Sequence, residues 1–233
     1  MKYTINTTAR IGGILYLVII VAGIFGEMFV RGKLVVPGDA VATAGNITAS
    51  PFLWRLGIAG DLLMHICDVS LMLVFYLLLS PVNKNLALLA VLFNLVQTAV
   101  LVANKLNLLT PLFLSGDAEY LQAFEPRQLQ ALGYLAIKSH GYGFGLGLIF
   151  FGCECLIVGY LIYRSGYLPK TLGVLMAAAG LCYHINSFAL ILDPSLANRL
   201  FPPILLPAFA GELSLCLWLM IKGVDPAKWR EPA

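Results

Sequence analysis

The chain has 233 residues, of which 60% are apolar and only 12% are charged, and its formal net charge is +3. A soluble domain carries about twice that share of charged residues, so this chain has too few to cover a globular core with a polar surface. Its 13 Phe, 10 Tyr and 3 Trp exclude a disordered chain. A small net charge without a basic stripe argues against nucleic acid as a partner. The composition therefore indicates a protein whose main surroundings are the lipid bilayer.

Six apolar stretches have about the 20 residues that cross a hydrocarbon layer of about 30 Å. We expect an all-α, polytopic integral membrane protein forming a single domain over residues 1–233. Its six transmembrane helices are predicted at residues 11–30, 53–79, 86–112, 141–163, 172–192 and 203–221. The first stretch follows Lys2 and Arg10 as a signal peptide would. It is too long for one and lacks a small-residue cleavage site, so we interpret it as a retained helix.

The loops that join these stretches, called joints below, predict the orientation of the chain in the membrane. With six spans, the short joints at residues 80–85 and 164–170 lie on the same side as both termini. That side has an excess of basic residues, namely Lys2, Arg10, Lys84, Arg164, Lys170, Lys222, Lys228 and Arg230 against Asp225 and Glu231. The other side is balanced, with Arg31, Lys33, Arg127, Lys138 and Arg199 against Asp39, Asp117, Glu119, Glu125 and Asp193. Because an excess of Lys and Arg marks the cytoplasm, we expect both termini to be cytoplasmic.

Two of the outer joints are long enough for structure of their own. Asp39 follows Pro37-Gly38 and is a suitable N-cap for a short helix through Ala49. Residues 125–138 alternate leucines with Arg and Gln at helical spacing, which indicates an amphipathic turn or two on the membrane surface. A single straight helix over residues 125–163 would be about 58 Å long. We therefore expect a bend or break in the glycine-rich stretch that begins at His140.

Ionisable side chains inside a spanning helix cost about 2.5–3.5 kcal/mol each on insertion scales, so those present here need a reason. Asp61, His65 and Asp68 share one face of the second stretch, at positions i, i+4 and i+7. Other polar residues fall at similar depth in the third to sixth stretches. We expect them to face one another in an outward-opening polar cavity, and the candidate binding residues are Asp61, His65, Asp68, Gln97, Asn104, Lys105, His140, His184 and Glu212.

Three kinds of function are compatible with such a cavity. The chain could bind or transport a small molecule or ion, with acids and histidines as a proton relay. It could be a structural or regulatory membrane subunit, in which carboxylates pair with Lys105, Arg55 and histidines to hold the helices in register.

The third kind is an intramembrane hydrolase that acts on a lipid or amphiphile, with a divalent metal such as zinc as cofactor. His65, His140 and His184, together with a nearby carboxylate, would supply metal ligands and leave a position for water. The local spacing is not a metal-binding signature. A haem held by His65 and His184 is a further geometric option. The five cysteines lie within apolar stretches, and we interpret them as small buried apolar residues.

Several segments resemble a family of bacterial and archaeal membrane proteins, the domain of unknown function DUF4386. They include Ala9-Arg-Ile-Gly-Gly-Ile-Leu-Tyr-Leu17, Arg55-Leu-Gly-Ile-Ala-Gly-Asp-Leu62, His140-Gly-Tyr-Gly143 and Leu206-Pro-Ala-Phe-Ala-Gly-Glu-Leu-Ser214. The resemblance extends from about Thr8 to Val224. It implies a six-helix protein in a prokaryotic cell membrane, the bacterial inner membrane in particular, and it implies no activity.

Overall fold

The computed structural model describes residues 4–229, and these are all helix, turn and loop. Six helices are long and apolar enough to cross a membrane, which confirms the predicted all-α, six-helix fold class. They comprise α1 (Ile5–Ile24) with its continuation η1 (Phe25–Arg31) and α2 (Gly32–Leu34), α4 (Pro51–Leu79), α5 (Lys84–Asn104) with α6 (Leu106–Leu114), α7 (Pro126–Ser165), α8 (Lys170–Leu192), and η3 (Pro203–Leu205) with α10 (Leu206–Ile221).

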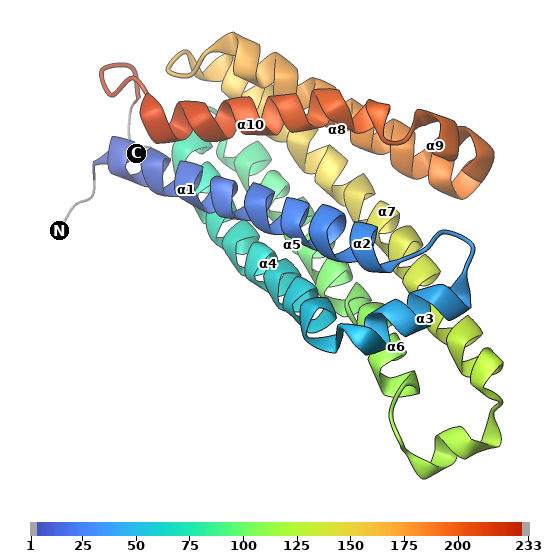
Figure 1. The fold of residues 1–233 in the computed structure, drawn as a ribbon. Helices are drawn as coiled ribbons and strands as arrows, with labels where there is room; N and C mark the ends of the chain where they lie inside the picture. Colours follow the sequence, from blue (N-terminus) through green and yellow to red (C-terminus); the bar gives the residue numbers. More distant parts are fainter. Residues whose placement is uncertain (1–3, 230–233) are drawn as a thin grey trace.

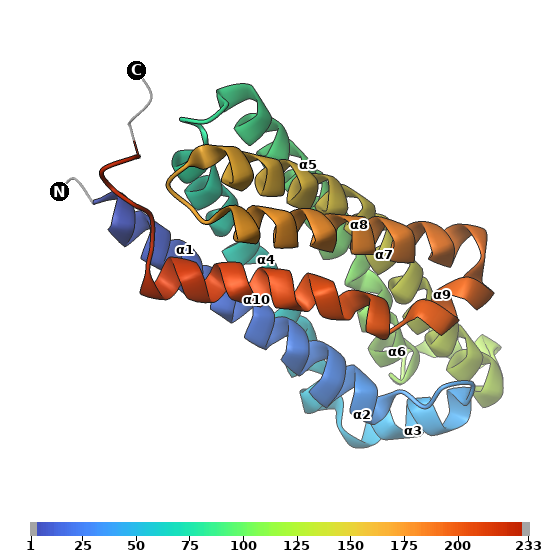
Figure 2. The same ribbon diagram turned by 90° about the horizontal axis from the view of Figure 1, so that it is seen from above.

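The long helices form a closed ring. Each packs against the next along the chain, from α1 through α4, α5, α7 and α8 to α10, and α10 packs back against α1. Figure 2 shows α10 lying between α1 and α8. The outward faces carry large apolar side chains, such as Ile66 and Leu73, each more than 60% exposed. This surface suits lipid rather than water.

The interior has two apolar clusters. The larger lies at the end where both termini meet and includes Leu78, Leu161 and Leu219. The smaller lies toward the opposite end, around Trp54 and Leu108, and the Trp54 indole Nε1 donates to the carbonyl of Leu108 at 2.7 Å. The polar residues of α4, α5 and α7 occupy the stretch between these clusters. The ring therefore surrounds a layer of polar residues, with one apolar cluster between this layer and each end of the ring.

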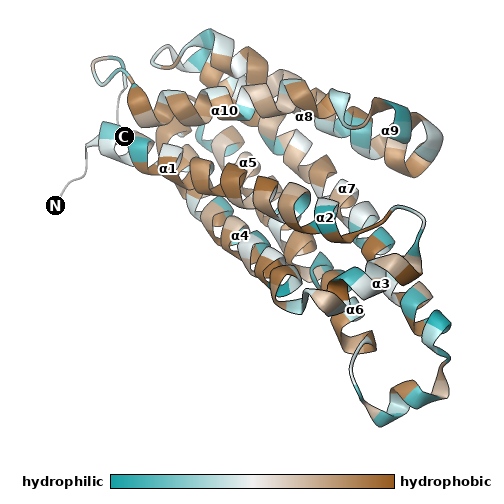
Figure 3. Cartoon of the chain, in the orientation of Figure 1, coloured by the Kyte–Doolittle hydropathy of each residue, from teal (hydrophilic) through white to brown (hydrophobic). Residues whose placement is uncertain are grey.

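Shorter helices occupy the end of the ring away from the termini: α3 (Ala40–Ala49), η2 (Glu119–Ala123) and α9 (Pro194–Leu200). The expected cap of α3 is present, since the Asp39 carboxylate accepts from the amide of Ala42 at 2.9 Å. Hydrophilic residues concentrate around η2 and the start of α7 (Figure 3). This distribution suits an end that lies at the membrane–water interface.

The expectation of a separate surface helix at residues 125–138 is wrong. These residues form the first part of α7, which runs for 40 residues without the expected break near His140. The Glu125–Gln128 capping box starts the helix at Pro126. At about 60 Å, α7 exceeds the hydrocarbon layer by roughly a factor of two. Its first turns find partners outside that layer in α3 and α6, which removes the reason for a break.

Candidate functional site

A group of charged side chains, which we call the charged cluster, comprises Glu27, Arg31, Asp61 and Lys105. Its centre is Asp61 of α4, which is only 1% exposed. Oδ2 of Asp61 accepts from Nη1 of Arg31 and from Nζ of Lys105, both at 2.8 Å. Arg31 also binds Glu27, with Nε 2.7 Å from Oε2. Two acids and two bases thus compensate each other, with Asp61 and Lys105 buried inside the ring and the Glu27 side chain 65% exposed at its outer surface.

Irregular backbone brings these charges together. Arg31 ends the π-helical segment η1, whose wider turn sets Glu27 and Arg31 on one side. Gly26, in the same segment, allows the close approach to α4, because a Cβ there would lie 2.5 Å from Oδ1 of Asp61. Lys105 is the single residue between α5 and α6. π-Helical segments occur frequently at functional sites, so this end of the polar layer is a candidate.

Two histidines adjoin the charged cluster. Nε2 of His140 lies 3.4 Å from Nζ of Lys105, and the carbonyl of His140 accepts from Nδ2 of Asn104 at 2.9 Å. His65 is 2% exposed, and neither of its ring nitrogens has a hydrogen-bond partner in the part of the chain that the structure describes. An imidazole buried without partners is costly, so His65 marks a position where a ligand or water would be favourable.

Farther along α4, a second group contains acids and amides without bases. This acidic cluster comprises Asp68, Asn94, Gln97, Thr98 and Glu154. Nδ2 of Asn94, 0% exposed, faces oxygens of Asp68, Gln97 and Glu154 at 3.2, 3.3 and 2.9 Å. The Thr98 hydroxyl lies 3.2 Å from Oδ2 of Asp68. One amide therefore bridges two carboxylates on different helices, α4 and α7.

Glu212 of α10 extends this group across the ring. The Tyr183 hydroxyl donates to Oε1 of Glu212 in a short hydrogen bond, and Tyr16 of α1 also lies beside this carboxylate. Glu212 is close enough to Asp68 and Glu154 for their charges to interact. Within residues 4–229, no ion pair joins any of these three carboxylates to a Lys, Arg or His.

His184 lies elsewhere, on the contact between α7 and α8. Its Nδ1 is 2.8 Å from the carbonyl of Gly180 and its Nε2 is 3.4 Å from Sγ of Cys153. A carbonyl can only accept, so Nδ1 carries a proton, and in the neutral imidazole Nε2 then accepts from the thiol. Cys153 thus has a polar role that its interpretation as a small apolar residue did not anticipate.

The three histidines proposed as metal ligands are not brought together. His65 and His140 adjoin the charged cluster, whereas His184 pairs with Cys153. Among the described residues, no group of three or more His, Cys, Asp or Glu side chains could hold a metal ion. The geometry therefore gives the metal-dependent hydrolase no support. Arg55, expected as an ion-pair partner, is exposed and makes no salt bridge within the described range.

Sequence reasoning missed several members of the site. Arg31 was placed in a joint, although its spacing of four from Glu27 signals a helical pair beyond the predicted end of the first span. Thr98 carried no signal, because a lone threonine in an apolar helix is unremarkable. Asn94 and Glu154 are polar residues of the expected band, but their direct contact across α5 and α7 cannot be read from spacing within either helix.

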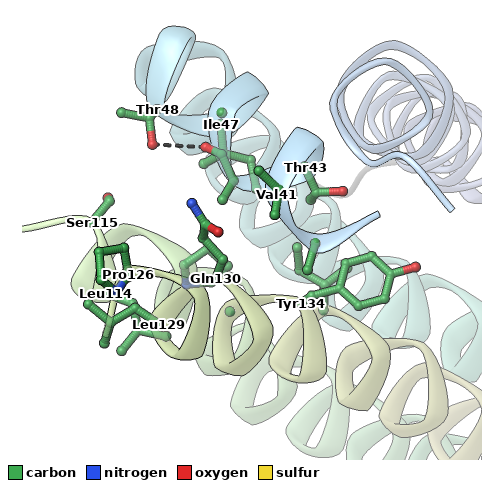
Figure 4. A pocket seen from close by; sticks show the side chains of 16 residues that line it. Val41, Thr43, Ile47, Thr48, Leu114, Ser115, Pro126, Leu129, Gln130 and Tyr134 are labelled. Atoms are coloured by element: carbon green, nitrogen blue, oxygen red, sulfur yellow. Dashed lines mark hydrogen bonds between the residues drawn. The ribbon is translucent and has the colours of Figure 1, made fainter. Parts of the chain in front are cut away.

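A cavity of about 450 Å³ lies outside both clusters, between α3, α6 and the start of α7 (Figure 4). It does not contain the candidate binding residues. Those side chains largely bond to one another, and the cavity is lined by apolar and neutral polar residues such as Ile47, Leu129 and Gln130.

The fold and site define a multi-pass membrane protein with a buried polar layer, and comparison places it in a family. Residues 11–223 match the family model described as a domain of unknown function, DUF4386, and the chain belongs to this family. It is 34% identical over 167 residues to an uncharacterised protein of Archaeoglobus fulgidus, an alignment that covers 71% of this chain and 83% of the relative. No solved structure matches the chain.

Proposed function

We propose that the protein binds or transports a small monovalent cation, the proton included, at the carboxylates of Asp68, Glu154 and Glu212. The observation that carries the proposal is that Asp68 and Glu154 share the Asn94 amide, that Glu212 is buried against the Tyr183 hydroxyl, and that, among the described residues, none of the three acids has a basic partner. In the charged cluster, by contrast, acids and bases are matched.

The cost of burying charge gives the reason. An ionised carboxylate away from water is very unfavourable unless it is paired, and neighbouring carboxylates cannot all ionise at close range. Amides and hydroxyls offset only part of this cost. In the acidic cluster, the Asn94 and Gln97 amides and the Thr98 hydroxyl face two carboxylates, and none of these donors carries a charge. A bound proton or monovalent cation supplies the missing positive partner.

The remaining candidate residues have supporting roles in this proposal. Asp61 and Lys105 hold α4, η1 and α5 together and set the position of His140. His65 lies on α4 between Asp61 and Asp68 and is the side chain best placed to accept a proton that passes between the two clusters. Gln97 and Asn104 orient their neighbours by hydrogen bonds, while His184 lies outside the path.

We also propose that the six helices form one domain with both termini in the cytoplasm. The described basic residues Arg10, Lys84, Arg164 and Lys170 lie at the terminal end of the ring and support this orientation. Lys2, Arg230 and Glu231, which entered the same charge count, lie outside the described residues.

Ion flux into proteoliposomes tests the proposal. Purified protein is reconstituted in liposomes with an internal pH indicator or a sodium indicator, and uptake is followed after an imposed gradient. We expect uptake of H⁺ or Na⁺ by the wild type and its loss in Asp68→Asn and Glu154→Gln. The matched control is Glu119→Gln, an exposed acid of η2 that should leave uptake unchanged.

If flux is absent, binding alone is measured by titrating Na⁺ or H⁺ against the thermal stability of the detergent-purified protein. The cation should raise the unfolding temperature of the wild type more than that of the two variants. Equal responses in the wild type, Asp68→Asn and Glu154→Gln, in both assays, would contradict the proposal.

A further inference from the structure

The cavity between α3, α6 and α7 has features that the cation site does not explain. It lies at the end of the ring away from the termini, where α6 and α7 leave the bundle and α3 packs across them (Figures 1 and 4). At about 450 Å³ it is large enough for a small organic molecule. Its floor is apolar, with Ile47, Leu114 and Leu129 on three different helices.

One polar atom in the wall lacks a partner. The amide of Gln130 projects from α7 toward α3 (Figure 4), and its Oε1 is buried without a hydrogen-bond partner within residues 4–229. Leaving a buried amide oxygen unpaired is unfavourable. A ligand with a hydroxyl or N–H group in the cavity would satisfy it.

A glycine of α3 is among the residues that line the cavity. Gly45 lies in the interior of α3, where glycine weakens a helix relative to alanine. A Cβ at Gly45 would find no atom within 4 Å, so no part of the described chain requires the glycine. A larger side chain can therefore be introduced at this point of the cavity lining without a clash inside the described chain.

The lining also restricts the charge of a ligand. Among residues 4–229, no Asp, Glu, Lys, Arg or His lines the cavity, and the other polar groups of the lining are hydroxyls such as those of Thr48, Ser115 and Tyr134. A charged group would be buried there without a counter-charge, which is unfavourable. A neutral molecule with an apolar body and one hydrogen-bond donor meets no such penalty.

We propose that the cavity between α3, α6 and α7 binds a neutral amphiphile, an apolar chain with a single hydroxyl or N–H group that donates to Gln130. The ligand reaches the cavity at the end of the ring away from the termini, the end we assign to the membrane interface. This site is separate from the carboxylates proposed for the cation, so either proposal can fail without the other.

Photolabelling tests the site. The probe is a diazirine analogue of dodecan-1-ol, and the protein is held in phosphatidylcholine nanodiscs. We expect labelling of α3 and of the first turns of α7, competed by unlabelled dodecan-1-ol. The matched pair is Gly45→Phe, which places a large side chain at the cavity lining, and Gly45→Ala, which adds one methyl group. Labelling should fall about tenfold in Gly45→Phe, the effect of losing about 1.4 kcal/mol of binding, and persist in Gly45→Ala.

Two further measurements keep the test decisive. Gln130→Leu leaves α3 unaltered and should lower labelling several-fold even if Gly45→Phe fails to fold. The carboxylate analogue of the probe should label weakly. Equal labelling of Gly45→Phe, Gln130→Leu and the wild type, or labelling spread evenly over the lipid-facing helices, would show that bulk lipid fills the cavity. Equal labelling by the carboxylate would overturn the neutral class.

Discussion

The most specific prediction about the charged cluster concerns Asp61. Replacing Asp61 with Asn removes the carboxylate that accepts from Arg31 and Lys105, each at 2.8 Å, and leaves the Lys105 ammonium, whose side chain is 4% exposed, without its partner. A hydrogen bond to a charged group contributes about 1.5–3 kcal/mol, and losing one partner of a buried pair costs about 3–5 kcal/mol. We therefore expect Asp61→Asn to lower the free energy of unfolding by about 3–5 kcal/mol.

The companion variant Lys105→Met removes one of the two bases and leaves Asp61 paired with Arg31. Its cost should be smaller, about 1.5–3 kcal/mol. The double variant Asp61→Asn/Lys105→Met leaves no lysine charge unpaired. Its loss in free energy of unfolding should therefore be smaller than the sum of the two single losses by about 1–3 kcal/mol.

The assay is unfolding of the detergent-purified protein by SDS titration, followed by circular dichroism. Glu119→Gln serves as the control, because substitution of an exposed side chain changes stability by about 0.5 kcal/mol or less. If Asp61→Asn were as harmless as this control, or if the single costs were simply additive, the cluster would not hold the helices together.

Three further predictions follow from single contacts. Gly26→Ala should destabilise the protein measurably by SDS titration, because the new Cβ would meet Oδ1 of Asp61. Tyr167→Phe should cost about 1 kcal/mol, since the hydroxyl donates to a carbonyl of α4 at 2.5 Å. Burial raises the pKa of the Tyr167 hydroxyl, so the neutral hydroxyl stabilises the fold fully below the unfolded pKa near 10. This contribution is lost as the pH rises through the higher pKa of the folded state. Above pH 10, the stability of Tyr167→Phe should therefore fall less than that of the wild type. Hydrogen bonds from Ser195 and from main-chain amides of α9 lower the pKa of Asp193. Its contribution to stability is therefore present above the unfolded pKa near 4 and is lost as the pH falls below that value and through the lower pKa of the folded state. The unfolding temperature of Asp193→Asn should change less across this range.

Local rules were enough to predict much of the fold. The six apolar stretches correspond to six long helices, and Asp39 caps α3 as its position before the helix indicates. The extent of α7 could not be predicted in the same way. A rule based on bilayer thickness limits the helix to the hydrocarbon layer, whereas contacts with α3 and α6 continue it well outside.

The candidate site was predictable only in part, for a similar reason. The face shared by Asp61, His65 and Asp68 follows from helical periodicity, and all three side chains are buried inside the ring. The grouping of residues from different helices depends on how the helices pack, which one sequence does not encode in its spacing. That packing separates His184 from the other histidines and divides the expected polar band into a charge-balanced cluster and an acidic one.

The most direct test of the account is the state of the carboxylates of Asp68, Glu154 and Glu212 in the purified wild-type protein. Infrared difference spectroscopy distinguishes protonated from ionised carboxyl groups by their C=O stretches. At neutral pH without added Na⁺, we predict a protonated-carboxyl band that weakens in Asp68→Asn and Glu154→Gln and, if the site accepts Na⁺, also when this ion is added. A wild-type spectrum with no such band, unchanged in both variants and by Na⁺, would contradict the claim that this cluster takes up a proton or monovalent cation.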